Sequence, residues 1–209
     1  MKRWFYIVLG CILILGVVYI YLHREELGLS APFESGSESS SATADLQPAH
    51  IDWVKVDRSP QGFTVAMPSG TAQIEVPAYN QQGGADQVTM IYSSPDAQTT
   101  FSVSWEDNPP VLQASGGSPG LTLDMARDDA LAHSQCTLVS ESRTALEGYP
   151  VRDFVGRNDS GGIFNARLVL AGQRLYMLMA AFPSATARRK QDVMHFFNSF
   201  HLVSATSND

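Results

Sequence analysis

The side chains of this chain that could do chemistry are serines, histidines, cysteines and a group of carboxylates. Serine is abundant, yet neither residues 115–118 nor residues 159–162 have the G-x-S-x-G spacing that exposes a nucleophilic serine. His133 and Cys136 are three positions apart, but a zinc site needs three or four ligands and no second pair accompanies them. We therefore predict that the protein is not an enzyme and that it holds no metal or cofactor.

Three carboxylates gather in the middle of the sequence. Asp124 and Asp128, with Asp129 beside them, are one helical turn apart and could form an acid–base pair or a calcium ligand set. A solvated helix face is the alternative interpretation. Residues 107–120 precede them as a loop rich in Pro, Gly and Ser, and long loops are often functional. A ligand or metal-ion sensor that uses the 107–120 loop region is therefore kept as the alternative function.

Two features could contact a partner. Trp105 ends a predicted strand beside this loop, where an aromatic ring can anchor a partner or can simply belong to the core. Arg188, Arg189 and Lys190 are the basic cluster outside the first residues of the chain. Positive charge near a helix N-terminus gains nothing from the helix dipole, so these side chains could meet an acidic partner or anionic headgroups.

The elements that must position these residues are mostly strands. Period-two alternation of β-branched and aromatic residues, bounded by turn residues, predicts them. They cover residues 62–67, 71–76, 87–94, 99–105, 138–145, 149–157, 162–170 and 173–182. The last four follow one another through short turns and should form an antiparallel meander.

Helical spacing appears twice. Leu123, Ala126, Ala130 and Leu131 recur at three to four residues within 121–136, with Thr122 as the candidate cap and Asp124 in the first turn. A second helix follows Pro183 with Ser184 as its cap, and residues 201–203 are a short strand or tail. The pattern predicts an α+β fold, an antiparallel β-sheet packed with two main helices, one on each side or both on one.

Three segments resemble the PsbP/Mog1-like superfamily. They are the opening strand and turn at 62–68 (GFTVAMP), a strand entry at 148–154 (GYPVRDF), and a closing strand and helix at 174–178 (RLYML) and 196–202 (FFNSFHL). The resemblance covers most of residues 51–203. It implies an α/β/α sandwich around an antiparallel sheet, and members that are mostly non-enzymatic binding or assembly modules, including bacterial envelope proteins. It implies no catalytic residues, because the family shares none.

Nineteen consecutive uncharged residues, Trp4 to Leu22, open the sequence. As a helix they would span roughly 28 Å, close to the hydrocarbon core of a bilayer. Aromatic residues stand at both ends, and Lys2 and Arg3 outweigh Arg24, which predicts a single-pass anchor with a cytoplasmic N-terminus. The alternatives are a cleaved signal peptide and a lipoprotein processed at Cys11, although the apolar run continues for eleven residues beyond Cys11.

The domain organisation follows from these observations. We predict a cytoplasmic tip and transmembrane anchor at 1–26, a Ser-rich flexible linker at 27–50, a globular domain at 51–203 and a disordered tail at 204–209. The formal net charge of −7 argues against nucleic acid as a partner. The predicted function is therefore a membrane-anchored interaction or assembly module of the cell envelope, on the periplasmic or extracellular side, that binds another envelope or membrane protein.

Overall fold

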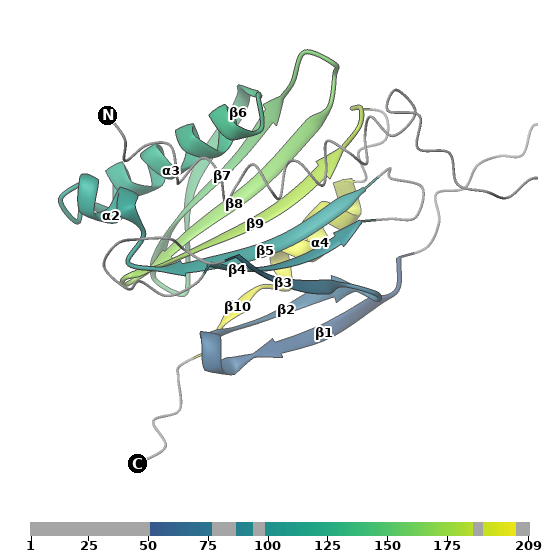
Figure 1. Ribbon diagram of the computed structural model, residues 1–209, viewed down its shortest axis with the longest axis horizontal. Coiled ribbons are helices and arrows are strands. Elements are labelled where there is room, and N and C mark those ends of the chain that lie inside the picture. Colours follow the sequence, from purple (N-terminus) through teal and green to yellow (C-terminus); the bar gives the residue numbers. More distant parts are fainter. Residues whose placement is uncertain (1–50, 77–86, 94–98, 186–189, 204–209) are drawn as a thin grey trace, which may run out of the picture.

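The computed structural model describes residues 51–76, 87–93, 99–185 and 190–203, which form two antiparallel sheets and three α-helices (Figure 1). The predicted anchor, linker and C-terminal tail lie outside the described residues. In chain order the elements are β1 (Trp53–Arg58), the 3₁₀ helix η1 (Ser59–Gln61), β2 (Phe63–Pro68), β3 (Ala72–Val76), β4 (Gln87–Ser93), β5 (Thr100–Asp107), α2 (Pro110–Ala114), α3 (Pro119–His133), β6 (Thr137–Leu146), β7 (Tyr149–Arg157), β8 (Ile163–Ala171), β9 (Arg174–Phe182), α4 (Lys190–Asn198) and β10 (His201–Leu202). None of the helices in these ranges combines the length and the apolar character that a membrane crossing needs.

The larger sheet has seven strands in the order β3-β4-β5-β9-β8-β7-β6. The predicted meander is confirmed, since β6, β7, β8 and β9 pair antiparallel with their neighbours in sequence. The strand β9 then pairs with β5, with Thr100 opposite Ala181 and Trp105 opposite Tyr176. This long-range pairing joins the two halves of the chain, and it leaves β6 at one edge of the sheet.

The prediction of one sheet was incomplete. The strands β1, β2 and β10 form a separate three-stranded sheet in the order β1-β2-β10. The chain leaves this sheet at Pro68, where the turn through Gly70, with a φ of 86°, precedes β3. A positive φ of this kind is readily available only to glycine, so the turn redirects the chain toward the second sheet. The strand β1 was not predicted.

One side of the large sheet is covered by α4 and the small sheet together. Fully buried phenylalanines meet there, namely Phe63 of β2, Phe101 of β5, Phe196 of α4 and Phe200, which follows α4. The ring of Phe63 lies 5.1 Å from that of Trp105 and 5.4 Å from that of Phe200, centroid to centroid. Each such ring contributes about 1.5–3 kcal/mol by leaving water.

The other side of the large sheet is covered by α3 (Figure 1). Leu123, Ala126 and Leu131 of this helix pack on Phe154 of β7 and on the even-numbered residues of β8. The two helices therefore lie on opposite faces of the sheet, which settles the placement that the sequence left open. The result is a layered α+β fold whose central strands are buried on both sides.

Two details of the predicted helices were wrong. The helix α3 begins at Pro119 with Ser118 as its N-cap, so Thr122 lies inside the helix and its hydroxyl donates to the carbonyl of Ser118 at 2.8 Å. Asp124 is consequently outside the first turn, which holds no acidic residue. In addition, the region predicted as a continuous loop contains α2, whose first residue is Pro110, a position where the missing N–H of proline costs nothing.

Candidate interaction surface

The structure corrects the expectation that Trp105 contacts a partner. Its side chain is 7% exposed and belongs to the core on the α4 side of the sheet. The reason is the strand period: Phe101, Val103 and Trp105 point to the same face of β5, and all three are buried. Trp105 is thus a core aromatic, which was the alternative interpretation of this residue.

The basic cluster is described only at its last member. Lys190 is the first residue of α4 and is exposed, whereas Arg188 and Arg189 lie outside the described residues. Met194, one helical turn after Lys190, is 62% exposed. The two side chains share the outer side of α4, because residues four apart lie on the same helix face.

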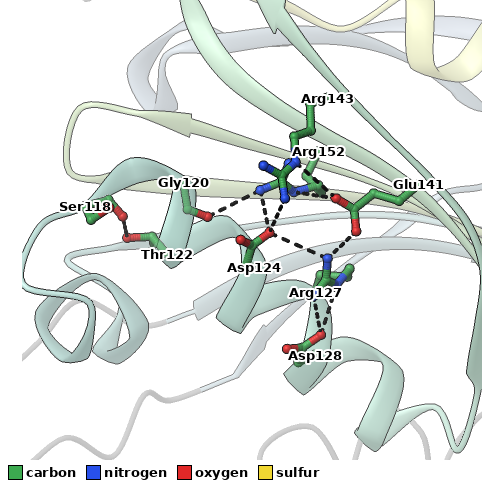
Figure 2. A network of polar contacts seen from close by, with 9 residues as sticks. All are labelled: Ser118, Gly120, Thr122, Asp124, Arg127, Asp128, Glu141, Arg143 and Arg152. Carbon is green, nitrogen blue, oxygen red and sulfur yellow. Dashed lines mark hydrogen bonds and ion pairs between the residues drawn. The ribbon is translucent and has the colours of Figure 1, made fainter.

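A second group of charged side chains was not predicted. Arg152 of β7 is 2% exposed and points toward α3, as does its cross-strand neighbour Leu168. Its guanidinium donates to the carboxylate of Asp124 at 2.5 Å and to the carbonyl of Gly120 at 3.3 Å (Figure 2). Its Nε lies 3.4 Å from Glu141 but has no hydrogen-bond acceptor among the described residues.

Arg127 of α3 completes the centre of this network. Its guanidinium contacts the carboxylate of Asp128 at 2.7 Å, that of Asp124 at 3.5 Å and that of Glu141 on β6 (Figure 2). Burial disfavours the charged guanidinium, but the hydrogen bonds to Asp128 and Glu141 outweigh burial and raise the pKa of Arg127 above its usual value. The network thus holds α3 against β6 and β7.

Arg143 of β6 lies at the outer border of the network. It is opposite Arg152 in the strand pairing, and its side chain is 71% exposed. It reaches Glu141 at 3.4 Å and Asp124 at 3.7 Å. The network therefore contains three arginines and three carboxylates, so its charges balance, and it changes from buried at Arg152 to exposed at Arg143.

This arrangement does not favour the cation site considered for Asp124 and Asp128. Both carboxylates contact arginine, whose permanent positive charge neutralises them and repels a metal ion. Across the residues that the structure describes, no group of three His, Cys, Asp or Glu side chains could hold a metal ion. Within these ranges, no observation supports the metal sensor.

The side chains of His133 and Cys136 contact backbone carbonyls close to them in the sequence. The ring Nδ1 of His133 lies 2.6 Å from the carbonyl of Asp129, and the thiol of Cys136 donates to the carbonyl of Ser134 at 3.3 Å. Burial raises the pKa of the Cys136 thiol, and the thiolate is the form that attacks electrophiles or binds zinc. His133 is the last residue of α3, and Cys136 directly precedes β6.

The sequence contained one signal that could have located the network. Period two along β7 places Arg152 on the same face as Phe154, whose ring is buried beneath α3. A charge on a face that must be covered by a helix requires a partner on that helix. Asp124 was predicted to lie on a helix, but the sequence did not show which strand this helix would cover.

Comparisons with known proteins agree with the fold. No family model and no curated protein matches the sequence. The solution structure of cyanobacterial PsbP (CyanoP) from Synechocystis sp. PCC 6803 is similar to this chain with a TM-score of 0.53, over 75% of this chain and 95% of that chain. The fold is PsbP-like.

The likeness concerns the fold alone, because only 12% of the aligned residues are identical. The crystal structure of LpqN, involved in cell envelope biogenesis of Mycobacterium tuberculosis, aligns with this chain at 11% identity and a TM-score of 0.42, over 75% of this chain and 93% of that chain. The likeness to CyanoP confirms, at the level of the fold, the PsbP-like resemblance read from the sequence.

Proposed function

We propose that this protein is a membrane-anchored module that binds another protein of the cell envelope and catalyses no reaction. The observation that carries the proposal is the uncharged segment from Trp4 to Leu22, placed before a Ser-rich stretch and a PsbP-like domain. Such a segment is long enough to cross a bilayer, and the charges beside it favour a cytoplasmic N-terminus. The domain would then be displayed on the periplasmic or extracellular side.

The outer side of α4 is the proposed contact for the partner. Lys190 and Met194 lie on it with their side chains exposed, and Arg188 and Arg189 precede it in the sequence. A positive border beside an exposed apolar side chain suits a partner that presents acidic residues around an apolar position.

Photo-crosslinking in the native cell tests this proposal. The full-length chain would carry a photoreactive amino acid at Met194, or at Val54 as a matched control, since Val54 is 51% exposed on the small sheet. We expect one reproducible envelope protein to be crosslinked from position 194 and a weaker adduct or none from position 54. Equal labelling of many proteins from both positions would contradict a specific contact at α4.

The orientation of the chain has a separate test. A membrane-impermeant maleimide applied to intact cells should label a Val54→Cys variant in a Cys11→Ser, Cys136→Ser background, because Val54 is exposed on the domain. A Lys2→Cys variant in the same background is the matched control and should remain unlabelled until the membrane is opened. Labelling of position 2 but not of position 54 in intact cells would reverse the proposed orientation.

A further inference from the structure

The strand β6 is a long edge of the seven-stranded sheet. It is the last strand in the sheet order, and β7 is its one neighbour within the described ranges. Eight of its ten residues are exposed. An edge strand presents outward N–H and C=O groups that can pair with another strand, so natural edges are usually short, covered or protected by charges.

The charges of β6 are arranged about its middle. Ser142 is flanked by Glu141 and Arg143, then by Ser140 and Thr144, then by Val139 and Ala145. When the strand meets an antiparallel copy of itself with Ser142 opposite Ser142, Glu141 faces Arg143 on both sides of the centre. Hydroxyl residues then face hydroxyl residues. Opposite charges and matched side chains at directly opposed positions stabilise a sheet.

The faces of the sheet agree with this pairing. Glu141 and Arg143 are opposite Phe154 and Arg152 of β7 and point toward α3, while Ser142 is opposite Asp153 and points to the other face. A two-fold axis perpendicular to the sheet keeps the α3 side of both copies on the same side. Residues whose side chains point to the same face of the sheet are therefore paired across the two copies, as a continuous sheet requires.

The two adjacent registers are unfavourable. An allowed register is centred on a residue, so that residues of the same face are paired, and the nearest alternative centres are Glu141 and Arg143. Centring on Glu141 places it opposite its own copy, and centring on Arg143 does the same to that residue. Like charges directly opposite are destabilising, so the charges favour the register centred on Ser142 over these two.

The layer above the sheet leaves room for a second copy. Leu131 of α3 lies over Gly156 of β7, because a Cβ added at Gly156 would lie 2.7 Å from Cδ2 of Leu131. The helix also packs on β8, farther from the edge. Two copies of β7 would be three strand spacings apart, about 14 Å. Packed helices are about 8–10 Å apart, so the two α3 helices would not collide.

We propose that two copies of this protein pair antiparallel through β6, with Ser142 on the two-fold axis, to form a continuous fourteen-stranded sheet. The regular ladder runs from Ser140 to Thr144, because the β-bulge between Leu138 and Ser140 ends the regular register. Such a short contact is weak in dilute solution and strengthened when both copies share a membrane, which raises their effective concentration. This dimer is independent of the envelope partner proposed at α4.

Cysteine crosslinking of the full-length chain in phosphatidylcholine vesicles tests the dimer and its register. In a Cys11→Ser, Cys136→Ser background, Ser142→Cys should form a disulfide-linked dimer under mild oxidation, because directly opposed Cα atoms are about 4.5–5.5 Å apart, within disulfide range. Ser140→Cys and Thr144→Cys are matched controls on the same exposed face. Each alone should fail, because identical positions would be about 13 Å apart.

The controls also supply the positive test of register. Vesicles that contain Ser140→Cys and Thr144→Cys chains together should give the mixed dimer, because these positions are opposed in the proposed pairing. Absence of the Ser142→Cys dimer overturns the proposal. Equal crosslinking of all three single variants also overturns it, since that result indicates random collision.

A charge reversal tests the basis of the pairing. In the Arg143→Glu variant, the new Glu faces Glu141 of the other copy on both sides of the two-fold axis. This repulsion should weaken association about tenfold. Lys55→Glu makes the same change of charge at an exposed position of β1 and should leave association unchanged. Both can be followed by energy transfer between labelled chains in vesicles. Equal effects of the two variants would show that net charge, rather than the β6 pairing, controls association.

Discussion

At the scale of single residues, the most informative side chain is Arg152. The residue is 2% exposed, and transfer of an unpaired charge to such a site would be prohibitive. The contacts with Asp124 and Glu141 offset that cost, and the carbonyl of Gly120 accepts one further hydrogen bond. The pairing fixes which turn of α3 lies over which residue of β7. It is therefore a constraint on the position of the helix as well as a source of stability.

Replacement of Arg152 by Met should destabilise the protein by about 2–4 kcal/mol, because Asp124 and Glu141 would lose a buried partner. Arg143→Met is the matched control. It removes an arginine from the same network at a side chain that is 71% exposed, and should cost less than about 1 kcal/mol. Urea unfolding of the full chain in mild detergent would measure both. Equal losses would contradict the assigned difference in burial.

Glu106 gives a prediction about pH. Burial raises the pKa of this carboxyl, and the negative charge of Asp107 adds to the effect. The folded protein therefore keeps the proton of Glu106 to a higher pH than the unfolded chain does. Stability from this difference is present below the unfolded pKa and is lost as the pH rises through the folded pKa.

Glu106→Gln should consequently raise the melting temperature at pH 7, with a gain that shrinks as the pH falls toward about 4. Asp159→Asn, which removes the same charge from an exposed turn, is the control and should show no comparable dependence. Thermal unfolding at a series of pH values would measure both. A gain for Glu106→Gln that is constant across this range would exclude the proposed cause.

At the scale of elements, the small sheet is attached to the large one through η1. Arg174 of β9 holds Asp107 through two hydrogen bonds of 2.5 and 2.7 Å, and it donates to the carbonyl of Gln61 at 2.5 Å. The hydroxyl of Tyr176 donates to the same carbonyl at 2.8 Å. Hydrogen bonds to Asp107 are the largest cause of a raised pKa at Arg174, which therefore stays charged. This junction requires the backbone after Gln61 to approach β9 closely.

Gly62 permits that approach. Its φ is 82°, and a Cβ added there would lie 2.9 Å from the hydroxyl oxygen of Tyr176, which is held by its own hydrogen bond. Gly62→Ala should destabilise the protein by about 2–4 kcal/mol through backbone strain and crowding together. Gly70→Ala is the matched control, with a φ of 86° and no atom within 4 Å of the added Cβ.

Gly70→Ala should therefore lose only the stability that the strained backbone costs, about 1 kcal/mol. The difference between the two variants isolates the contact with Tyr176. A Gly62→Ala, Tyr176→Phe double variant removes the hydroxyl and should recover part of that difference, as a double-mutant cycle would reveal. If the two glycine variants lose equal stability, close packing at Gly62 is not what selects glycine.

Sequence patterns predicted the elements to unequal degrees. The hairpins β7–β8 and β8–β9 were predictable because turn residues, including Gly161 and Gly172 at positive φ, separate strands of clear alternation. The helix α2 was not, because five residues are too few for a helical period and its stability depends on packing against α3. The strand β1 was missed because three of its six residues are exposed and three are charged.

At the scale of the whole molecule, the order of the strands was the least predictable feature. The pairing of β5 with β9 joins segments more than sixty residues apart, and alternation shows only which side of a strand is apolar. It does not show which other strand lies beside it. The same limit hid the separate small sheet, where β10 at the end of the chain pairs with β2 near the start of the domain. The PsbP-like resemblance implied a sandwich around one antiparallel sheet, but it gave neither the strand order nor the separate small sheet.

The two cores make the domain boundary testable. In the described part of the chain, the buried apolar residues on both sides of the large sheet come from Ile51 to Phe200, and β8 and β9 contribute to both cores. Because the same strands separate the two cores, loss of either should unfold the whole sheet, so the domain should unfold in one transition. Residues 51–203 expressed alone should then remain soluble and melt cooperatively at the temperature of the full chain. Aggregation, or a melting temperature many degrees lower, would show that residues 1–50 complete the fold and would extend the domain toward the predicted anchor.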